Sequence, residues 1–157
     1  HLPKQAVLID GDLTRLVQVV TNLLNNASKF TPAHGKITLR GRIGSQGIIE
    51  SQCPNASHGP GESQGVQARE CLIIEVSDTG IGIPESMLPR VFELFAQVGP
   101  ALDRAKGGLG IGLSLVRKLV QMHDGQVCAK SMGENRGSTF TIQLPLHRSD
   151  QTNAVPS

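Results

Sequence analysis

The feature that most constrains the fold is a stripe of apolar residues along one predicted helix. From Leu13 onward, apolar residues recur at spacings of three and four, at Leu16, Val20, Leu23, Ala27 and Phe30. This period predicts a helix that buries one face against a core. The preceding Asp10-Gly11-Asp12 can turn the chain and cap the helix, which is expected to end near Thr31-Pro32. The short apolar run from Gln5 to Asp10 predicts a strand before the helix.

Four further segments have the composition of strands. Apolar residues alternate with polar ones in Lys36 to Ile43, and Cys71 to Ser77 is rich in β-branched residues, so the two are predicted to be neighbouring strands. Gln126 to Met132 and Ser138 to Leu144 are predicted as two strands joined by a hairpin loop at residues 133–137.

Two more helices complete the predicted order of elements. Pro84 to about Glu93 is predicted as a short helix, because proline is tolerated in a first helical turn. Gly110 to Asp124 is predicted as a helix that ends at Gly125, a residue suited to a left-handed cap. Its expected buried stripe comprises Ile111, Leu115, Leu119 and Met122. Strands and helices without strict alternation predict an α+β sandwich: a mixed, mainly antiparallel sheet with helices on one face.

The chain has the length of one domain. We predict that residues 1–146 form it, with a flexible insertion at residues 44–70 and a disordered tail at residues 147–157. The insertion holds many Gly, Ser and Pro residues and almost no large apolar side chains, a composition that cannot repay the entropy of ordering.

Composition also excludes several classes of function. The net charge is only +2 and the chain contains no Trp or Tyr, so we expect no nucleic-acid binding. No stretch approaches the roughly 20 apolar residues of a membrane span, so we expect a cytoplasmic domain without direct membrane contact, which can still be the cytoplasmic part of a membrane-bound sensor.

A row of polar residues follows the first helix. Asn22, Asn26 and Lys29 lie at positions i, i+4 and i+7, so they share one line along its surface. Amide oxygen is a hard ligand that suits Mg²⁺, and a lysine adds a point charge for phosphate. Taken alone, the row is also compatible with a plain solvated face.

A carboxylate and two glycines follow the second predicted strand. At the end of a strand, Asp78 can accept a hydrogen bond from the exocyclic amino group of adenine, and Gly80 and Gly82 allow the backbone to approach a flat ring. The same Asp-x-Gly pattern is also ordinary turn chemistry.

A third pattern is a glycine cluster that leads into the last predicted helix. The first free N–H groups and the dipole of that helix favour an anion, and the cluster comprises Gly107, Gly108, Gly110 and Gly112. Neither the dinucleotide fingerprint nor the P-loop spacing occurs, which argues against both of those folds. A flexible hinge is the other interpretation, and it is compatible with a loop that closes on ATP.

The order of these patterns is more specific than any one of them. Residues 22–30, 78–84, 90–95 and 107–113 resemble the four nucleotide-binding boxes of the GHKL ATP-binding superfamily, and specifically those of bacterial sensor histidine kinases. The resemblance covers roughly residues 10–145, apart from the insertion. It implies the α+β sandwich of that superfamily and binding of ATP with Mg²⁺.

The resemblance also implies roles for individual residues. Asn26 would supply an oxygen to Mg²⁺, while Asn22 and Lys29 would act at the phosphates as catalytic residues. Asp78 would bind the adenine amino group, and the Ser138 hydroxyl would help to orient Asp78. The remaining implied contacts with the nucleotide or its lid are Gly80, Gly82, Ile83, Phe92, Phe95, Gly108, Leu109, Gly110, Gly112 and Leu113.

Related GHKL ATPases such as gyrase and the Hsp90 chaperones carry a glutamate at the position of Asn22, and an amide cannot serve as a general base. The resemblance therefore implies transfer of the γ-phosphate to a histidine on a separate dimerisation and acceptor domain of the same protein. A downstream response regulator is the further partner that the resemblance implies. The isolated domain is expected to be a monomer. Two alternatives remain open: a GHKL serine kinase of the anti-sigma-factor type, and a non-catalytic ATP-sensing module.

Overall fold

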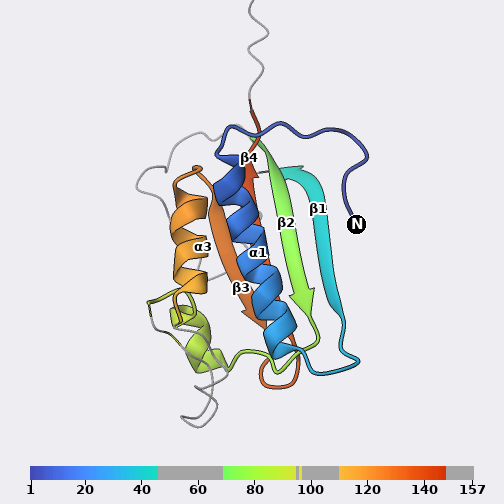
Figure 1. Ribbon diagram of the computed structural model, residues 1–157, viewed down its shortest axis with the longest axis vertical. Coiled ribbons are helices and arrows are strands. Elements are labelled where there is room, and N and C mark those ends of the chain that lie inside the picture. The colour runs from blue at the N-terminus through green and yellow to red at the C-terminus, as the bar shows by residue number, and fades with distance from the viewer. Residues whose placement is uncertain (46–68, 95, 97–109, 148–157) are drawn as a thin grey trace, which may run out of the picture.

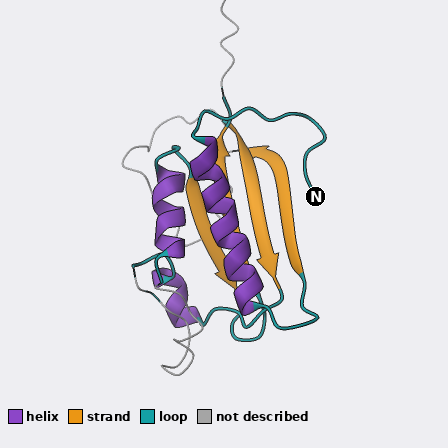
Figure 2. Cartoon of the chain, in the orientation of Figure 1, coloured by secondary structure: helices purple, strands orange, loops and turns teal. Residues whose placement is uncertain are grey.

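The fold is a two-layer sandwich in which helices cover one face of an antiparallel sheet (Figures 1 and 2). The computed structural model describes residues 1–45, 69–94, 96 and 110–147. The sheet has the order β1-β2-β4-β3, and each neighbouring pair is antiparallel. The strands are β1 Ile37–Ser45, β2 Glu70–Asp78, β3 Gln126–Ser131 and β4 Ser138–Pro145, and the helices are α1 Leu13–Phe30, the 3-10 helix η1 Glu85–Arg90 and α3 Gly112–Gln121. The predicted α+β fold is confirmed.

Helix α1 forms where the apolar period predicts it. Its N-cap is Asp12, whose side chain accepts a hydrogen bond from the Arg15 N–H at 3.2 Å, and its C-cap is Thr31. Leu23 and Ala27 of the predicted stripe are buried. Val19 is buried as well, so the true buried face is rotated by a fraction of a turn from the predicted one.

The prediction of a strand at Gln5 to Asp10 is wrong. This segment crosses the end of the sheet as a loop on its way from the β1 edge to α1 (Figure 1). A strand needs a ladder of backbone partners, and here the bonds instead tie the segment to the end of the described chain: the His147 N–H donates to the Leu8 carbonyl at 2.9 Å, and His147 Nδ1 lies 2.7 Å from an Asp10 carboxylate oxygen.

The edge of β1 is occupied instead by His1. The His1 N–H group donates to the Leu39 carbonyl at 3.0 Å, and the Gly41 N–H donates to the His1 carbonyl at 2.8 Å. This is the hydrogen-bond pattern of a parallel pair, whereas the four main strands pair antiparallel.

Helix α3 begins later than predicted, and its buried face overlaps the predicted stripe only at Leu119 and the partly buried Leu115. Val116, Leu119 and Val120 are buried, whereas Ile111 and Met122 at the two ends are exposed. The left-handed residue at its end is Asp124, with φ of 53°, and not Gly125. Glycine is required at position 125 for another reason: a Cβ there would lie 2.6 Å from the Gln143 carbonyl oxygen of β4.

The core lies between the helices and the sheet. It contains Leu23 from α1, Val76 from β2, Val120 from α3 and Ile142 from β4, each with at most 1% of its surface exposed. Burial of this apolar surface holds the two helices over the sheet and thereby fixes the lower ends of α1 and β2 beside each other (Figure 1).

Parts of the predicted insertion and tail are ordered. Gly44 and Ser45 belong to β1 and Glu70 belongs to β2, while residues 46–68 lie outside the described part of the chain. His147 is hydrogen-bonded, as noted above, and residues 148–157 also lie outside it. Over the described ranges, no helix combines the length and the apolar character needed to traverse a bilayer.

Candidate nucleotide-binding site

The candidate site is built around Asp78, the last residue of β2. One carboxylate oxygen accepts a hydrogen bond from the Gly80 N–H at 2.8 Å, and the other accepts one from the Ser138 hydroxyl at 2.5 Å. Ser138 stands directly across from Asp78 in the β2–β4 register. Two donors on two different segments therefore fix the orientation of the carboxylate before any ligand binds.

The loop after Asp78 depends on its glycines. Gly82 has a φ of 70°, which favours glycine, and a Cβ at Gly80 would lie 2.8 Å from an Asp78 carboxylate oxygen. The Ile81 N–H donates to the Phe30 carbonyl at 3.1 Å, which ties the loop to the last residue of α1. The predicted role of these glycines as places of close backbone approach is therefore compatible with the geometry.

A pocket opens between this loop, α1, α3 and β4. It encloses about 430 Å³, including the open space at its mouth. Among its described lining residues Asp78 is the one charged group, and most of the wall is apolar. The lining residues are Asn26, Ala27, Phe30, Asp78, Ile81, Gly82, Ile83, Val91, Leu113, Ser138 and Phe140. Apolar walls around one fixed carboxylate suit a flat heterocycle that carries an amino group.

The pocket collects six of the predicted site residues from four parts of the chain: Asn26, Asp78, Gly82, Ile83, Leu113 and Ser138. Two others lie nearby on α1 without lining it. Asn22 is half-buried one helical turn before Asn26, and Lys29 is exposed, with its Nζ 4.9 Å from the centroid of the Phe30 ring.

The start of α3 leaves room for a ligand. Gly110 has a φ of 68°, and a Cβ at Gly112 would meet nothing within 4 Å. The N-cap residue of α3 is Ile111, and no described side chain caps the helix. Within the described part of the chain, no side chain occupies its first N–H groups, whereas Asp12 caps those of α1, and such N–H groups favour an anion.

Phe92 packs inside the fold. It is buried against Phe140, with ring centroids 6.2 Å apart and ring planes at 84°. Since Phe140 lines the pocket, Phe92 supports the pocket wall from behind. The predicted contacts at Phe95, Gly108 and Leu109 lie outside the described residues.

Some residues of the site were not predicted from the sequence. The apolar lining residues Ala27, Phe30, Val91 and Phe140 belong to helix and strand faces that resemble any core surface. Ser131 at the end of β3 is the main polar omission: its hydroxyl oxygen accepts a hydrogen bond from the Ile83 N–H at 3.0 Å. The predicted hairpin had a loop of residues 133–137, which ends the first strand at Met132, whereas the observed register ends it at Ser131, directly opposite Ser138.

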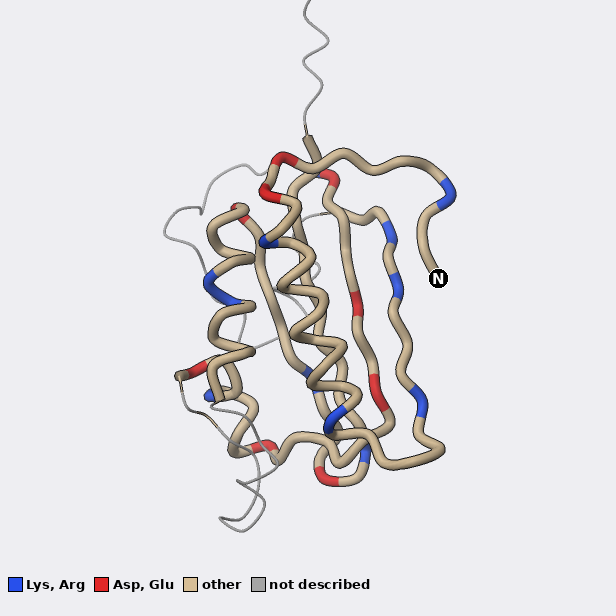
Figure 3. The backbone as a smooth tube through the Cα atoms, in the orientation of Figure 1, with Lys and Arg blue, Asp and Glu red and all other residues tan. Residues whose placement is uncertain are grey.

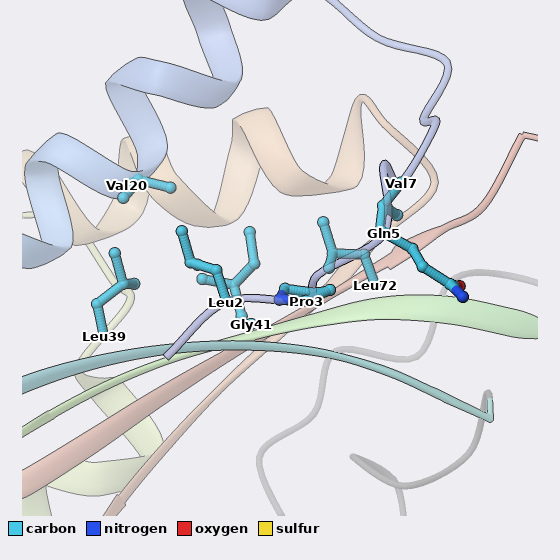
Figure 4. A pocket seen from close by; sticks show the side chains of 9 residues that line it. Leu2, Pro3, Gln5, Val7, Val20, Leu39, Gly41 and Leu72 are labelled. Carbon is cyan, nitrogen blue, oxygen red and sulfur yellow. The ribbon is translucent and has the colours of Figure 1, made fainter.

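A second pocket is larger but lacks such chemistry. It encloses about 720 Å³, including open space, between the N-terminal segment, α1 and the first two strands (Figure 4). Its lining is aliphatic apart from Gln5, with Leu2, Val20 and Leu39 among the walls. No charged side chain among the described residues lines it, so it offers nothing to hold phosphate or Mg²⁺.

The amide row fits a magnesium ion that is shared with phosphate. Among the described residues there is no group of three or more His, Cys, Asp or Glu side chains placed to hold a metal. Mg²⁺ keeps several waters and is commonly held by one or two protein groups plus substrate phosphates. The Asn26 amide on the pocket wall can supply one such protein group. The phosphates of a nucleotide and water would supply the other ligands.

Comparison with known proteins decides the family. Residues 11–148 match the family described as histidine kinase-, DNA gyrase B-, and HSP90-like ATPase. The chain belongs to this family. It is thus a catalytic ATP-binding domain of the histidine kinase type, and the predicted resemblance is confirmed.

Individual relatives agree with this assignment. Over 143 residues the chain is 40% identical to hybrid signal transduction histidine kinase D of Dictyostelium discoideum, a match covering 88% of this chain and 9% of that protein. The catalytic domain of histidine kinase ThkA shares the fold, with a TM-score of 0.62, 23% identity and coverage of 92% of this chain and 76% of that one. A crystal structure of full-length ShkA in complex with AMPPNP has a TM-score of 0.62 at 25% identity, covering 94% of this chain and 25% of ShkA.

The curated relatives are much longer than this chain. The match spans from 9% of histidine kinase D to 20% of sensor histidine kinase WalK of Bacillus subtilis. These relatives therefore carry additional parts, which is consistent with a domain that works beside other domains of one protein.

Proposed function

We propose that this domain binds Mg²⁺-ATP in the Asp78 pocket and donates the γ-phosphate to a histidine on a separate dimerisation and acceptor domain of the same protein. The observation that carries the proposal is the Asp78 carboxylate, held by Ser138 and Gly80 at one end of an apolar pocket. A flat base fits between the apolar walls, and the carboxylate can accept a hydrogen bond from the adenine amino group.

The phosphates would extend from the base toward α3 and α1. The uncapped N-terminus of α3 offers N–H groups and the positive end of its dipole, and Asn26 supplies an amide oxygen on the other side. When bound, Mg²⁺ would neutralise charge on the phosphates. Lys29 is exposed on the same helix and can reach toward phosphate, and Asn22 supports this end of the row.

An amide in the α1 row supports transfer to a separate histidine rather than to water. At the position where related GHKL ATPases carry a glutamate base, the α1 row has Asn22, and an amide does not accept a proton at neutral pH. Catalysis then rests on positioning and on charge stabilisation of the transferred group. A histidine from another domain would be the nucleophile, and a response regulator would receive the phosphate next.

His123, the described histidine that is followed by an acidic residue, is not suited to be the acceptor. His123 uses both ring nitrogens inside the fold: Nε2 accepts from the Asp12 N–H at 3.0 Å, and Nδ1 lies 2.7 Å from the Leu119 carbonyl oxygen. A ring bonded on both sides is a poor nucleophile.

The use of ATP also favours a cytoplasmic location. We propose in addition that the isolated domain is a monomer.

The test is a phosphotransfer assay with radiolabelled ATP and Mg²⁺. The purified chain is incubated alone, and then with the separately produced acceptor domain encoded with it. The proposal expects little label on the chain alone and acid-labile label on the acceptor domain. Efficient labelling of this chain would contradict the separate acceptor, acid-stable label on a partner serine would indicate a serine kinase, and ATP binding without transfer would indicate a sensing module.

A further inference from the structure

Two serines face each other at the closed end of the β3–β4 hairpin. Ser131 is the last residue of β3 and Ser138 is the first of β4, and they are direct partners in the register. Directly opposed residues of an antiparallel pair project to the same face of the sheet. Ser138 donates to Asp78 at the start of the base-facing loop, and Ser131 accepts from Ile83 at its end. One cross-strand pair therefore holds both ends of this loop.

The Ser131 hydroxyl uses its full hydrogen-bonding capacity. Its oxygen accepts from the N–H groups of Ile83 at 3.0 Å and Gly133 at 3.3 Å. Its proton is directed at the Gly137 carbonyl at 2.7 Å, with the Gly133 carbonyl at 3.2 Å. A hydroxyl has one donor and two acceptor positions, so Ser131 joins the base-facing loop to the hairpin loop with no capacity left over.

We propose that Ser131 is a positioning residue that sets the base-binding end of the pocket. The inference rests on the proposed function, because it assigns the residue a role in holding the nucleotide base. Ile83 is only 6% exposed and its side chain lines the pocket, directly after Gly82 with its left-handed backbone. The Ser131 oxygen satisfies the Ile83 N–H in this half-buried place, and so fixes where the Ile83 side chain lies.

The rest of the loop has its own anchors, which makes the effect of Ser131 local. The Gly137 N–H donates to the Gly80 carbonyl at 3.0 Å, and the Asn135 N–H donates to the Ile81 carbonyl at 2.6 Å. Removal of the Ser131 hydroxyl therefore leaves the loop attached and frees its last residue. The phosphate end, at Asn26 and the start of α3, makes none of these bonds.

The first arm of the test needs no ligand. Amide hydrogen exchange is measured by NMR in the unmodified chain, in Ser131→Ala and in Ser131→Thr, which keeps the hydroxyl. Ser77→Ala is the matched control. It removes the hydrogen bond between the Ser77 and Thr139 hydroxyl groups, which lie 3.0 Å apart on the residue pair next to Asp78 and Ser138. Exchange at the Ile83 amide should rise roughly tenfold in Ser131→Ala, as the loss of one partner of a half-buried donor implies, and stay unchanged at Gly80.

The second arm compares two ligands by calorimetry. Ser131→Ala should weaken Mg²⁺-ATP binding roughly tenfold and leave the affinity for Mg²⁺-tripolyphosphate, which has no base, unchanged. Ser131→Thr should restore ATP binding, and Ser77→Ala should bind both ligands normally. Equal losses for ATP and tripolyphosphate, or unchanged exchange at Ile83, would overturn the positioning role. If the unmodified chain does not bind ATP while Ile83 responds as expected, the proposed function is what fails.

Discussion

Replacement of Asp78 by asparagine tests the base-recognition chemistry with minimal change of shape. Both carboxylate oxygens already accept one hydrogen bond each, from Gly80 and from Ser138. A carboxylate offers about four lone-pair positions, so about two remain for a ligand. In Asp78→Asn one oxygen becomes an amide NH₂, which is a donor, and the negative charge is lost.

The size of the effect follows from the setting of the carboxylate. Asp78 is half-buried and its neighbours in the pocket wall are mostly apolar, so water cannot fully replace a lost acceptor. A hydrogen bond to a charged group contributes about 1.5 to 3 kcal/mol. Since about 1.4 kcal/mol corresponds to a tenfold change, ATP affinity should fall by about 10- to 150-fold.

The assay is titration calorimetry of Mg²⁺-ATP, with Mg²⁺-tripolyphosphate as the base-free ligand. Tripolyphosphate should bind Asp78→Asn as well as it binds the unmodified chain. The matched control is Glu75→Gln, which removes one negative charge from the same strand, where Glu75 lies 3.9 Å from Arg42 outside the pocket. The reasoning is refuted if Asp78→Asn binds ATP normally, or if Glu75→Gln weakens ATP binding as much.

Three further predictions concern the metal, the core and a buried thiol. Asn26→Ala should make ATP affinity nearly independent of Mg²⁺ in titrations with and without the ion, whereas the exposed neighbour Asn25→Ala should keep that dependence. Leu23 has 0% of its surface exposed, so Leu23→Ala should lower the free energy of unfolding, measured in urea, by about 2 to 5 kcal/mol. Leu13 is 76% exposed, so Leu13→Ala should lower it by no more than about 0.5 kcal/mol. Burial raises the pKa of the Cys71 thiol above its ordinary value of 9.0, so this group contributes stability that is present below that pH and is lost as the pH rises further. Between pH 8 and pH 10 the unmodified chain should therefore lose more stability than Cys71→Ala, and equal losses would contradict the assignment.

The sequence predicted those elements whose signal is repeated over many residues. The period of α1 spans 18 residues, so a single misplaced position, such as the unpredicted burial of Val19, does not obscure it. The pairing of β1 with β2 and the final hairpin also follow from alternation and turn composition. Asp78 and Ser138 were matched through family resemblance, and the register places them directly opposite each other.

The failures come from features that a local pattern does not contain. Residues 5–10 have the composition of a strand, but whether a strand forms depends on a free edge, and His1 occupies the edge of β1. The predicted stripe of α3 included Ile111 and Met122, which lie just outside the helix and are exposed, whereas Val116 and Val120 beside Leu119 are buried. Gly125 is required by close approach to β4, while the left-handed conformation falls on Asp124.

Charge composition alone could not locate the site. Figure 3 shows Lys and Arg as well as Asp and Glu on the described helices, strands and loops. The site depends instead on one carboxylate among apolar neighbours, a contrast that appears only when α1, β2, α3 and β4 come together.

A crystal structure of this chain with Mg²⁺ and a non-hydrolysable ATP analogue tests the central claim most directly. The account predicts the adenine amino group within hydrogen-bond distance of an Asp78 carboxylate oxygen, the phosphates at the start of α3, and the metal on the Asn26 amide oxygen. An analogue bound in the aliphatic pocket beside Leu39, or bound with its base away from Asp78, would contradict it.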